Sequence, residues 1–392
     1  MNSILYIILF LCFNGIVAQE IRKTMKDLPD TGQNTSYTNV PGEDADYVIN
    51  PPSYTDLKNG IVLDNVTGLQ WQKTDAGEMT HELALLYADT ATLGGFTDWR
   101  LPSPLEAYSI FNFSKNRPPL DMTAFSPSTA EYWWTNLPQY NDATKVWVTN
   151  AGGGIGNHLK KETISAGGTK KIHTRIVRDV NIPPILPMQY SRTDYGSIID
   201  AKTNLEWFPS PSADSMNWEQ ALQFVEQAVA GSHEDWRMPN AKEVFSLASL
   251  SHSSPSINPI FGITTTNTMY WSSTTLLNQT DKAWYLDSRY GITTYALKTQ
   301  RLKVLAVRNA GTTSGIEDIK EIHRIITNDK QIVLTDMSDN TRISMYDLLG
   351  NCILNEELKS SEWHSPSLQC GAYILHINNL NSLQSHIVII SP

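Results

Sequence analysis

The chain has 392 residues, 41% of them hydrophobic and 18% charged, and its formal net charge is −10. This composition excludes a disordered chain and indicates a globular protein with room for two or three domains. An acidic chain is also a poor partner for nucleic acid, so we expect none. Cysteine occurs only at Cys12, Cys352 and Cys370. The sequence between Cys12 and Cys352 therefore holds no thiolate for catalysis or metal binding.

The first residues fit an export signal. Residues 4–13 form an uninterrupted apolar run, which is too short to span a bilayer but long enough for the core of a signal peptide. Ala18 supplies a small residue at the expected cleavage point. We therefore predict a signal peptide over residues 1–18, a protein that is secreted or held at the outer cell surface, and no transmembrane segment. The polar residues 19–53 are predicted to form an extended N-terminal arm.

The middle of the chain contains one pattern twice. Trp71 and Trp207 end similar segments 136 positions apart, and the Asp-Trp-Arg segments that start at Asp98 and Asp235 are 137 positions apart. A near-constant offset over several motifs indicates a duplicated domain. We assign copy 1 to residues 54–181 and copy 2 to residues 188–310, with a proline-rich linker between them.

Each repeated motif has a structural interpretation. Residues 61–72 predict a β-hairpin, and residues 83–91 and 218–228 place apolar side chains on one face of a helix. Ser103 and Glu106 then form a capping box. We expect Glu106 and Asp98 to cap this helix and neutralise Arg100 rather than to act in acid–base catalysis. We expect the tryptophans of the repeated motifs to anchor the core. The motif residues are Trp71, Asp98, Trp99, Arg100 and Glu106 in copy 1, and Trp207, Asp235, Trp236, Arg237 and Glu243 in copy 2.

The remaining segments favour β-structure. Aromatic, β-like runs follow each predicted helix pair, and the glycine-rich residues 152–156 predict a wide turn rather than a nucleotide-binding loop. From residue 321 onward, short β-rich runs alternate with turn residues, which predicts a small all-β sandwich over residues 321–392. Cys352 and Cys370 lie in this domain, and the sequence leaves their pairing open because it does not fix their separation.

The motifs of both copies resemble a known family. Residues 67–71 read Thr-Gly-Leu-Gln-Trp, residues 98–103 read Asp-Trp-Arg-Leu-Pro-Ser, and Tyr132-Trp133 and Val177-Arg178 follow. This combination resembles the Lcl C-terminal domain family, named after a Legionella collagen-like adhesin. The Arg-Leu-Pro element is also similar to one in formylglycine-generating-enzyme-like domains. The resemblance implies an α+β architecture in which each copy has a C-type-lectin-like fold. Copy 1 departs from the family pattern at Trp134 and Asn136, where small hydroxyl residues are usual, and copy 2 departs at Asn204.

The C-terminal domain resembles a second family. Residues 342–350 and 368–375 are similar to the type A sorting domain of the type IX secretion system. This resemblance implies export across two membranes through the type IX machinery, followed by cleavage of the domain.

Signals for catalysis or metal binding are weak. His81-Glu82 opens a predicted helix, but position 85 is Leu, so the zinc-binding His-Glu-x-x-His pattern is incomplete. The sequence has no Gly-x-Ser-x-Gly motif and no phosphate-binding loop. We therefore expect a protein that is not an enzyme, with no cofactor and no metal site.

Two basic segments occupy corresponding places in the copies. Residues 157–178 hold six Lys or Arg and one Glu, and residues 289–308 hold five Lys or Arg and no acid. One interpretation is a pair of solvated edge strands protected by lysine; the other is a face that binds a sulfated or acidic polysaccharide. The candidate ligand-binding residues are Lys160, Lys161, Lys170, Lys171, Lys298, Arg301 and Lys303. The sequence favours an adhesin or glycan-binding module, with a structural or protein-interaction component of the cell surface as the alternative.

Overall fold

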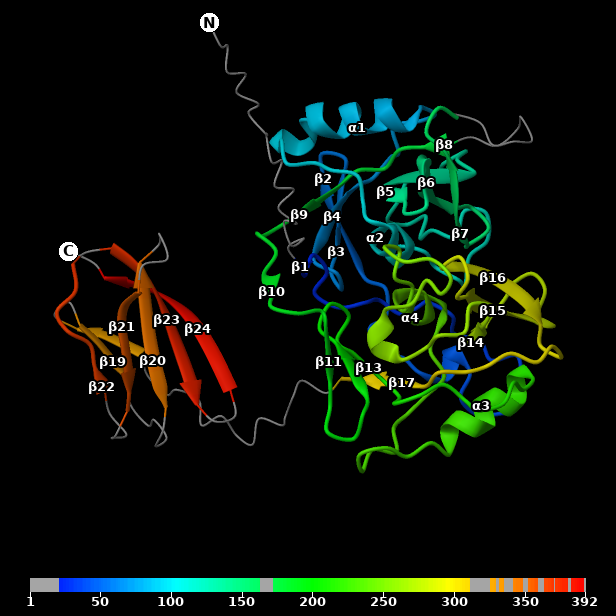
Figure 1. Cartoon of the computed structure of the whole chain (residues 1–392). Helices are drawn as coiled ribbons and strands as arrows, with labels where there is room; N and C mark the ends of the chain where they lie inside the picture. Colours follow the sequence, from blue (N-terminus) through cyan, green and yellow to red (C-terminus); the bar gives the residue numbers. More distant parts are fainter. Residues whose placement is uncertain are drawn as a thin grey trace, which may run out of the picture. The chain divides into compact units, whose positions relative to one another are not determined.

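The computed structural model describes residues 21–162 and 172–310, and near the C-terminus 325–328, 331–334, 341–347, 352–358, 363–369, 371–379 and 382–390 (Figure 1). The predicted signal peptide lies outside these residues. The chain divides into two compact units, Met1–Ala310 and Gly311–Pro392, and the described residues form many strands and few helices. Within the described residues, no helix has the length and apolarity needed to cross a membrane.

Copy 1 contains two four-stranded sheets and two helices. The first sheet has the order β2-β3-β4-β9, and the second has the order β7-β6-β5-β8 with β5 and β8 parallel. The strands are β2 (Tyr54–Lys58), β3 (Ile61–Asp64), β4 (Leu69–Gln72), β5 (Tyr132–Gln139), β6 (Asp142–Asn150), β7 (Ile155–Leu159), β8 (Ile172–His173) and β9 (Val177–Asp179). The helices are α1 (His81–Thr90) and α2 (Pro104–Ser109), with a 3-10 turn, η2, at Leu93–Gly95.

Copy 2 repeats this plan with a three-stranded second sheet. Its sheets have the orders β11-β12-β13-β17 and β14-β15-β16. The strands are β11 (Tyr190–Arg192), β12 (Ile198–Asp200), β13 (Leu205–Trp207), β14 (Met269–Thr275), β15 (Lys282–Asp287), β16 (Ile292–Leu297) and β17 (Val307–Asn309). The helices are α3 (Trp218–Glu226) and α4 (Ala241–Ser246), with η3 at Pro259–Phe261.

The predicted hairpin at residues 61–72 is confirmed as β3 and β4. In its turn, Asp64 Oδ1 accepts hydrogen bonds from the backbone N–H groups of Val66 and Thr67 at 3.0 and 3.2 Å. Gly68 has a φ of 74°, and the corresponding Asn204 of copy 2 has a φ of 57°. Glycine and asparagine are the residues that tolerate this left-handed conformation, which explains why the two copies differ here without changing the turn.

The two copies share one hydrophobic core, to which α2 and α4 both contribute. These two helices lie next to each other where the copies meet (Figure 1). Tyr108 of α2 packs against Phe245 of α4 with ring centroids 5.0 Å apart. The fully buried Trp71 and Trp207 belong to the same cluster. The two copies therefore form one compact unit with a shared core.

Each copy adds an outer cluster beneath its longer helix. Trp99 and Trp134 lie under α1, whereas Trp236 and Trp271 pack with Trp218 of α3. The predicted apolar face of α1 is wrong at Leu83, whose exposed fraction is 54%. The fully buried Trp134 fills the space beneath α1, so that only small or flat side chains face it. These are His81, Ala84 and Ala88.

The N-terminal arm packs into this body instead of extending into solvent. Strand β1 (Ile21–Arg22) pairs with β10 (Ile185–Leu186) in the linker. Met25 and Leu28 are buried in the shared core. A 3-10 turn, η1 (Asp44–Asp46), lies against β14. The arm has little regular structure, and burial of these side chains fixes its path.

The described strands of the second unit form two antiparallel sheets with the orders β18-β19-β22 and β21-β20-β23-β24. They are β18 (Ile325–Asn328), β19 (Gln331–Leu334), β20 (Arg342–Asp347), β21 (Cys352–Glu357), β22 (Trp363–His364), β23 (Gly371–Asn379) and β24 (Ser382–Ile390). Leu334 of one sheet and Ile343 of the other lie in one buried cluster, so the two sheets pack on each other. Cys352 is exposed, and Cys370 lies outside the described residues.

Candidate functional site

A pocket of about 120 Å³ opens where copy 1 meets copy 2, and we call it the seam pocket. Copy 1 contributes the segment 113–119 and the turn at Gly152-Gly153 between β6 and β7. Copy 2 contributes residues 276–279, which follow β14, together with Trp284 of β15 and Tyr295 of β16. The pocket therefore exists only because the two copies are joined.

Three aromatic rings form its apolar wall. Trp284 is held between Phe113 and Tyr295 in edge-to-face contacts, with ring centroids 5.5 and 5.7 Å away. Trp284 is almost fully buried, whereas Tyr295 is 43% exposed. Gly153 has a φ of 94°, and a Cβ placed there would lie 3.2 Å from Trp284. The predicted glycine turn thus allows the backbone of copy 1 to approach a tryptophan of copy 2 closely.

The polar part of the seam pocket carries positive charge. Lys115 and Arg117 are exposed at its rim, and the described residues that line it include no Asp or Glu. The amides of Asn116, Asn278 and Gln279 complete the lining. Such a lining offers cationic donors together with amide donors and acceptors.

An open groove, the seam groove, continues from the pocket over copy 2. It is lined by Gln279, Asp281, Lys282, Tyr285, Tyr295, Ala296, Leu297 and Gln300, with a volume of about 580 Å³. Gln279 and Tyr295 belong to both the pocket and the groove. Lys282 Nζ donates to Gln279 Oε1 at 2.6 Å and lies 5.3 Å from the Tyr295 ring centroid.

The predicted arginine–glutamate motif is structural in both copies. Arg100 donates two parallel hydrogen bonds of 2.8 Å to Glu106, and Arg237 donates two of 2.6 Å to Glu243. Burial alone would raise the pKa of the Glu106 carboxyl, but the Arg100 guanidinium outweighs it and holds that pKa below its usual value. Glu106 also accepts from the backbone N–H of Ser103 at 2.7 Å, which completes the predicted capping box.

The prediction that Asp98 neutralises Arg100 is wrong. Asp98 pairs instead with Arg178, through hydrogen bonds of 2.7 and 3.0 Å. The second carboxylate on Arg100 is Asp179, at 3.0 and 3.1 Å. Copy 2 repeats the arrangement, because Asp235 pairs with Arg308. Asp98 and Arg100 are only two residues apart, but the arginine that Asp98 contacts is Arg178 of β9.

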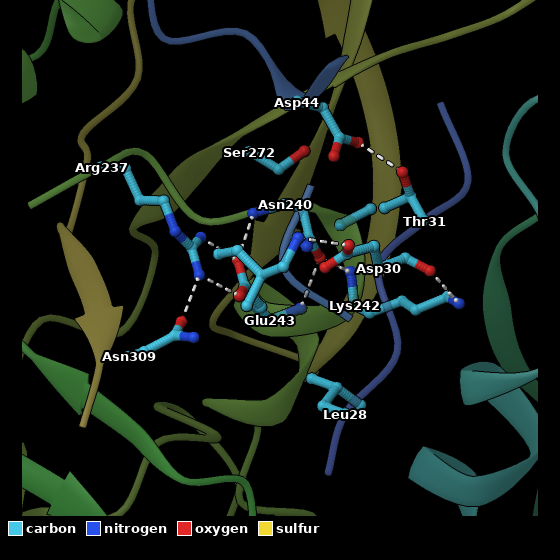
Figure 2. A network of polar contacts seen from close by, with 12 residues as sticks. Leu28, Asp30, Thr31, Asp44, Arg237, Asn240, Lys242, Glu243, Ser272 and Asn309 are labelled. Carbon is cyan, nitrogen blue, oxygen red and sulfur yellow. Dashed lines mark hydrogen bonds and ion pairs between the residues drawn. The ribbon is translucent and has the colours of Figure 1, made fainter. Parts of the chain in front are cut away.

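A buried polar network ties the arm to α4 (Figure 2). The Nζ of the fully buried Lys242 donates to the backbone carbonyls of Asp30 and Ser109 at 2.8 and 2.6 Å. Burial lowers the pKa of Lys242 to about 7. Asp44 accepts hydrogen bonds from Thr31 at 2.7 Å and Thr274 at 2.5 Å. Burial raises the pKa of Asp44 to about 7 despite those two bonds.

One grouping of serine, histidine and aspartate lies in copy 1. Asp75 accepts hydrogen bonds from Ser128 and from the Trp133 indole, and its second oxygen lies 2.9 Å from His173 Nδ1. Burial favours the neutral form of Asp75, but the hydrogen bonds from His173 and Ser128 hold its pKa at about 2. The serine hydroxyl is directed at the carboxylate and not at the imidazole. This differs from a nucleophile activated by a histidine base.

Comparison with known proteins agrees with these repeated motifs. The family model of the Lcl C-terminal domain matches residues 60–178 and 196–308. The chain belongs to the Lcl C-terminal domain family. Both Arg–Glu motifs and both copies of the Asp-Trp-Arg segment lie within the matched residues.

Two further comparisons add little. No curated protein matches the chain. Among solved structures, it is similar to PorZ of Porphyromonas gingivalis, described as an essential bacterial surface component of the type-IX secretion system. The identity is 8% and the TM-score 0.17, over 63% of this chain and 29% of PorZ. The chain thus spans under a third of PorZ, and a likeness at this level supports no argument.

The Lcl C-terminal domain of copy 2 uses its predicted ligand-binding cations internally. Lys298 Nζ lies 3.8 Å from the Trp218 ring centroid and 4.0 Å from Glu43. Arg301 donates to the backbone carbonyl of Ser215 at 2.5 Å, and Lys303 donates to those of Ser212 and Ala213, each at 3.1 Å. These contacts connect the segment after β16 to α3, to the loop before α3 and to the arm.

The predicted cations of copy 1 are placed differently. Lys160 is half-buried and Lys161 is exposed, both just after β7. Lys170 and Lys171 lie outside the described residues. Arg175 and Arg178, which contributed to the predicted positive charge, are buried and bind the copy's own groups.

Sequence reasoning missed the residues of the seam pocket, although a signal was present. At an offset of 137, Lys115 and Arg117 correspond to His252 and Ser254. At the same offset, Gly152-Gly153 corresponds to Arg289-Tyr290. A comparison of the two copies for positions where they diverge in charge and size would have pointed to this region.

Proposed function

We propose that this protein is a secreted, non-catalytic binding protein of the bacterial cell surface, and specifically an adhesin that recognises acidic polysaccharide through two fused, C-type-lectin-like Lcl C-terminal domains. The observation that carries the proposal is the distribution of cations on copy 1. Lys115, Arg117 and Lys161 are exposed there, whereas the cations predicted for copy 2, Lys298, Arg301 and Lys303, contact groups of the protein itself.

Affinity of this kind requires several contacts at once. Each exposed ion pair contributes only about 0.2–1 kcal/mol, and a polyanion presents repeated groups that several cations can hold together. The net charge of −10 repels anionic ligands elsewhere on the chain. Binding should weaken with salt, because the screening length falls from about 10 Å at 0.1 M to about 3 Å at 1 M.

Retention of the full chain on immobilised heparin tests the proposal. A variant in which Lys160, Lys161, Lys170 and Lys171 are changed to Ala should elute at lower salt than the parent. The matched variant with Lys298, Arg301 and Lys303 changed to Ala should lose thermal stability more than retention, because those side chains hold copy 2 together. Parent protein that passes through the column at low salt would exclude the proposal.

Export through the type IX system is part of the same proposal, with residues 321–392 as a cleaved sorting domain. Two packed sheets in the second unit support a small all-β domain of this size. Intact-mass measurement of surface-released protein should give a chain that starts near Gln19 and ends before about residue 321. A mature chain that still contains Cys352 would exclude cleavage.

A structural or protein-interaction role is the second candidate, and the outer face of α1 favours it. Leu83, Leu85 and Leu86 are 54%, 45% and 56% exposed. Neighbouring exposed leucines on one helix are typical of contact surfaces. In this case sedimentation velocity should detect self-association that the Leu83→Ser, Leu86→Ser double variant abolishes.

A further inference from the structure

We propose that the seam pocket and the seam groove together bind one acidic oligosaccharide, with a sugar ring on Tyr295 and its carboxylate or sulfate between Lys115 and Arg117. The inference rests on the proposed function and gives it a site. Both copies are needed, since the cations come from copy 1 and the ring from copy 2.

The volumes of the seam pocket and the seam groove indicate which part of the ligand each can hold. The seam pocket, at about 120 Å³, is smaller than the ~300–1,000 Å³ typical of sites that enclose a whole ligand. It can receive a charged substituent with its water, but not a chain of sugars. The adjoining groove is open and larger, at about 580 Å³. The sugar rings therefore lie in the groove, and one substituent enters the pocket.

Tyr295 is a fixed platform at the junction of pocket and groove. Its ring makes an edge-to-face contact with Trp284, and Lys282 Nζ lies over one face of the ring, 5.3 Å from its centroid, which leaves the other face for a ligand. The exposed face of a tyrosine can pack against the apolar C–H face of a pyranose while the hydroxyl stays in water. Because the ring is already held in place, binding costs little side-chain entropy.

The remaining lining of the seam pocket suits a polyhydroxylated anion, and the groove adds one carboxylate, Asp281, next to Lys282 in the chain. Asn116, Asn278 and Gln279 provide amide donors and acceptors for hydroxyl groups. Lys282 Nζ donates a hydrogen bond to Gln279 Oε1, so the Nε2 of that amide is the group left to donate to a ligand. Lys115 and Arg117 face no carboxylate among the described residues of the pocket lining.

Copy 2 does not repeat this site in the residues that correspond to the cations and the glycine turn of copy 1. Where copy 1 has Gly152-Gly153, copy 2 has Arg289-Tyr290, with the Arg289 guanidinium 4.6 Å from the Tyr290 ring centroid. Where copy 1 has Lys115 and Arg117, copy 2 has one histidine and one serine. Copy 2 thus lacks both the open turn and the pair of permanent cations.

A peptide is the less suitable occupant. Extended peptides are commonly captured along the free edge of a sheet, where backbone groups supply the hydrogen bonds. Residues of the outer strand β16 line the groove, but the seam pocket, which receives the charged group, is lined by aromatic rings, cationic and amide side chains and a glycine turn. We therefore assign the site to a saccharide and make an acidic peptide an outcome of the test.

Calorimetric titration of the full chain with a heparin-derived hexasaccharide tests the site, with polygalacturonate oligomers to distinguish carboxylate from sulfate. Tyr295→Ala should weaken binding by about tenfold or more, and Tyr295→Phe, which keeps the ring, should bind like the parent. Tyr290→Ala is the matched control, because it removes an exposed tyrosine outside the seam, in the turn of copy 2 that corresponds to Gly152-Gly153. Changing Lys115 and Arg117 to Ala should weaken binding and reduce its salt dependence.

The outcomes separate the site from the proposed function. Tyr295→Ala and the variant with Lys115 and Arg117 changed to Ala could bind the hexasaccharide like the parent, while the variant with four lysines (160, 161, 170 and 171) changed to Ala loses binding. In that case the seam is not the site, but the adhesin proposal stands. If the parent binds no acidic saccharide, both proposals fail. If polyglutamate displaces the hexasaccharide at equal concentration, the assignment to a saccharide is overturned.

Discussion

The arginine–glutamate pairs of the two copies are ion pairs that differ in how deeply they are buried. Arg237 and Glu243 form an ion pair, and both side chains are more than nine-tenths buried. Removal of one partner leaves a buried charge without compensation, which is more costly than the net value of the pair. The two copies differ in solvent access, because Arg100 is 29% exposed and Arg237 is 6% exposed.

We predict that Arg237→Ala lowers the free energy of unfolding by about 3–5 kcal/mol, and that Arg100→Ala lowers it by about 3 kcal/mol or less because water can reach Glu106 once the side chain is gone. Lys161→Ala, at an exposed position, should stay within about 0.5 kcal/mol of the parent. Urea unfolding followed by tryptophan fluorescence measures all three. Equal losses for the two arginine variants would show that solvent access does not set the cost.

Tryptophan positions show how the copies compensate for each other's substitutions. Copy 1 has His81 and Trp134 where copy 2 has Trp218 and Ser272, at offsets of 137 and 138. Trp134 and Trp218 are both fully buried, and Trp218 Nε1 donates to the Ser272 carbonyl at 2.8 Å. The large ring comes from the sheet in one copy and from the helix in the other, which explains why copy 1 departs from the family pattern at Trp134.

This exchange predicts a double-mutant result. Trp134→Ser alone should cost about 3–5 kcal/mol because it leaves a cavity beneath α1. His81→Trp alone should cost about 1–3 kcal/mol by overpacking. The double variant His81→Trp, Trp134→Ser should recover part of both losses, giving an interaction free energy of about 0.5–3 kcal/mol in thermal or urea unfolding. Strict additivity would mean that the two positions do not share one space.

Asp44 should make stability fall as the pH approaches neutrality. Its pKa in the folded protein is about 7, raised by burial. Between about pH 4 and 7 the folded state keeps a proton that the unfolded state has released, so stability decreases with pH over that range. Asp44→Asn keeps a hydrogen-bond acceptor but does not titrate. Between pH 5 and pH 8 the variant should gain about 2–3 kcal/mol relative to the parent in urea unfolding. A difference that does not change with pH would contradict the raised pKa.

At the scale of elements, the helix caps are the features that sequence predicts best. Ser103 Oγ accepts one backbone N–H of α2, at 3.4 Å, whereas Asn240 Oδ1 accepts two of α4, each at 3.0 Å. Ser103→Ala should cost about 1 kcal/mol, and Asn240→Ala should cost more, up to about 2 kcal/mol. Thermal melts of the two variants, with the half-buried cap residue Asn217→Ala of α3 as a third, would reveal the order. A larger loss for Ser103→Ala would contradict it.

Local signals were readable from the sequence because they act over a few residues. The capping boxes, the β3–β4 hairpin and the burial of Trp71 and Trp207 all follow from neighbouring residues. The partner of Asp98 could not be read, because Arg178 is 80 positions away. Lys242 shows the same limit, since its place in the sequence corresponds to Leu105 of copy 1 and only the arm explains why a lysine can be buried there.

At the scale of the whole molecule, the two copies form one compact unit with a shared core. The linker and the arm both run through contacts with the body, and the shared core holds the central tryptophan of each first sheet. A domain that buries its core against its own duplicate cannot lose one half without exposing the other. The seam pocket is a consequence, because it lies at the border where neither copy alone has a complete surface.

We therefore predict that the two copies unfold together and that the C-terminal unit unfolds separately. Scanning calorimetry of the full chain should show one large transition for residues up to 310 and a second, smaller one for the rest. Trp71→Ala in copy 1 and Trp207→Ala in copy 2 should each lower the midpoint of the same large transition, because both rings belong to one cluster, and each loss should be about 3–5 kcal/mol. Ile343→Ala, in the cluster of the second unit, is the matched control and should move only the smaller transition. If the large transition splits, with Trp71→Ala shifting one part and Trp207→Ala the other, then the copies are separate domains and the seam between them is a contact that opens without unfolding.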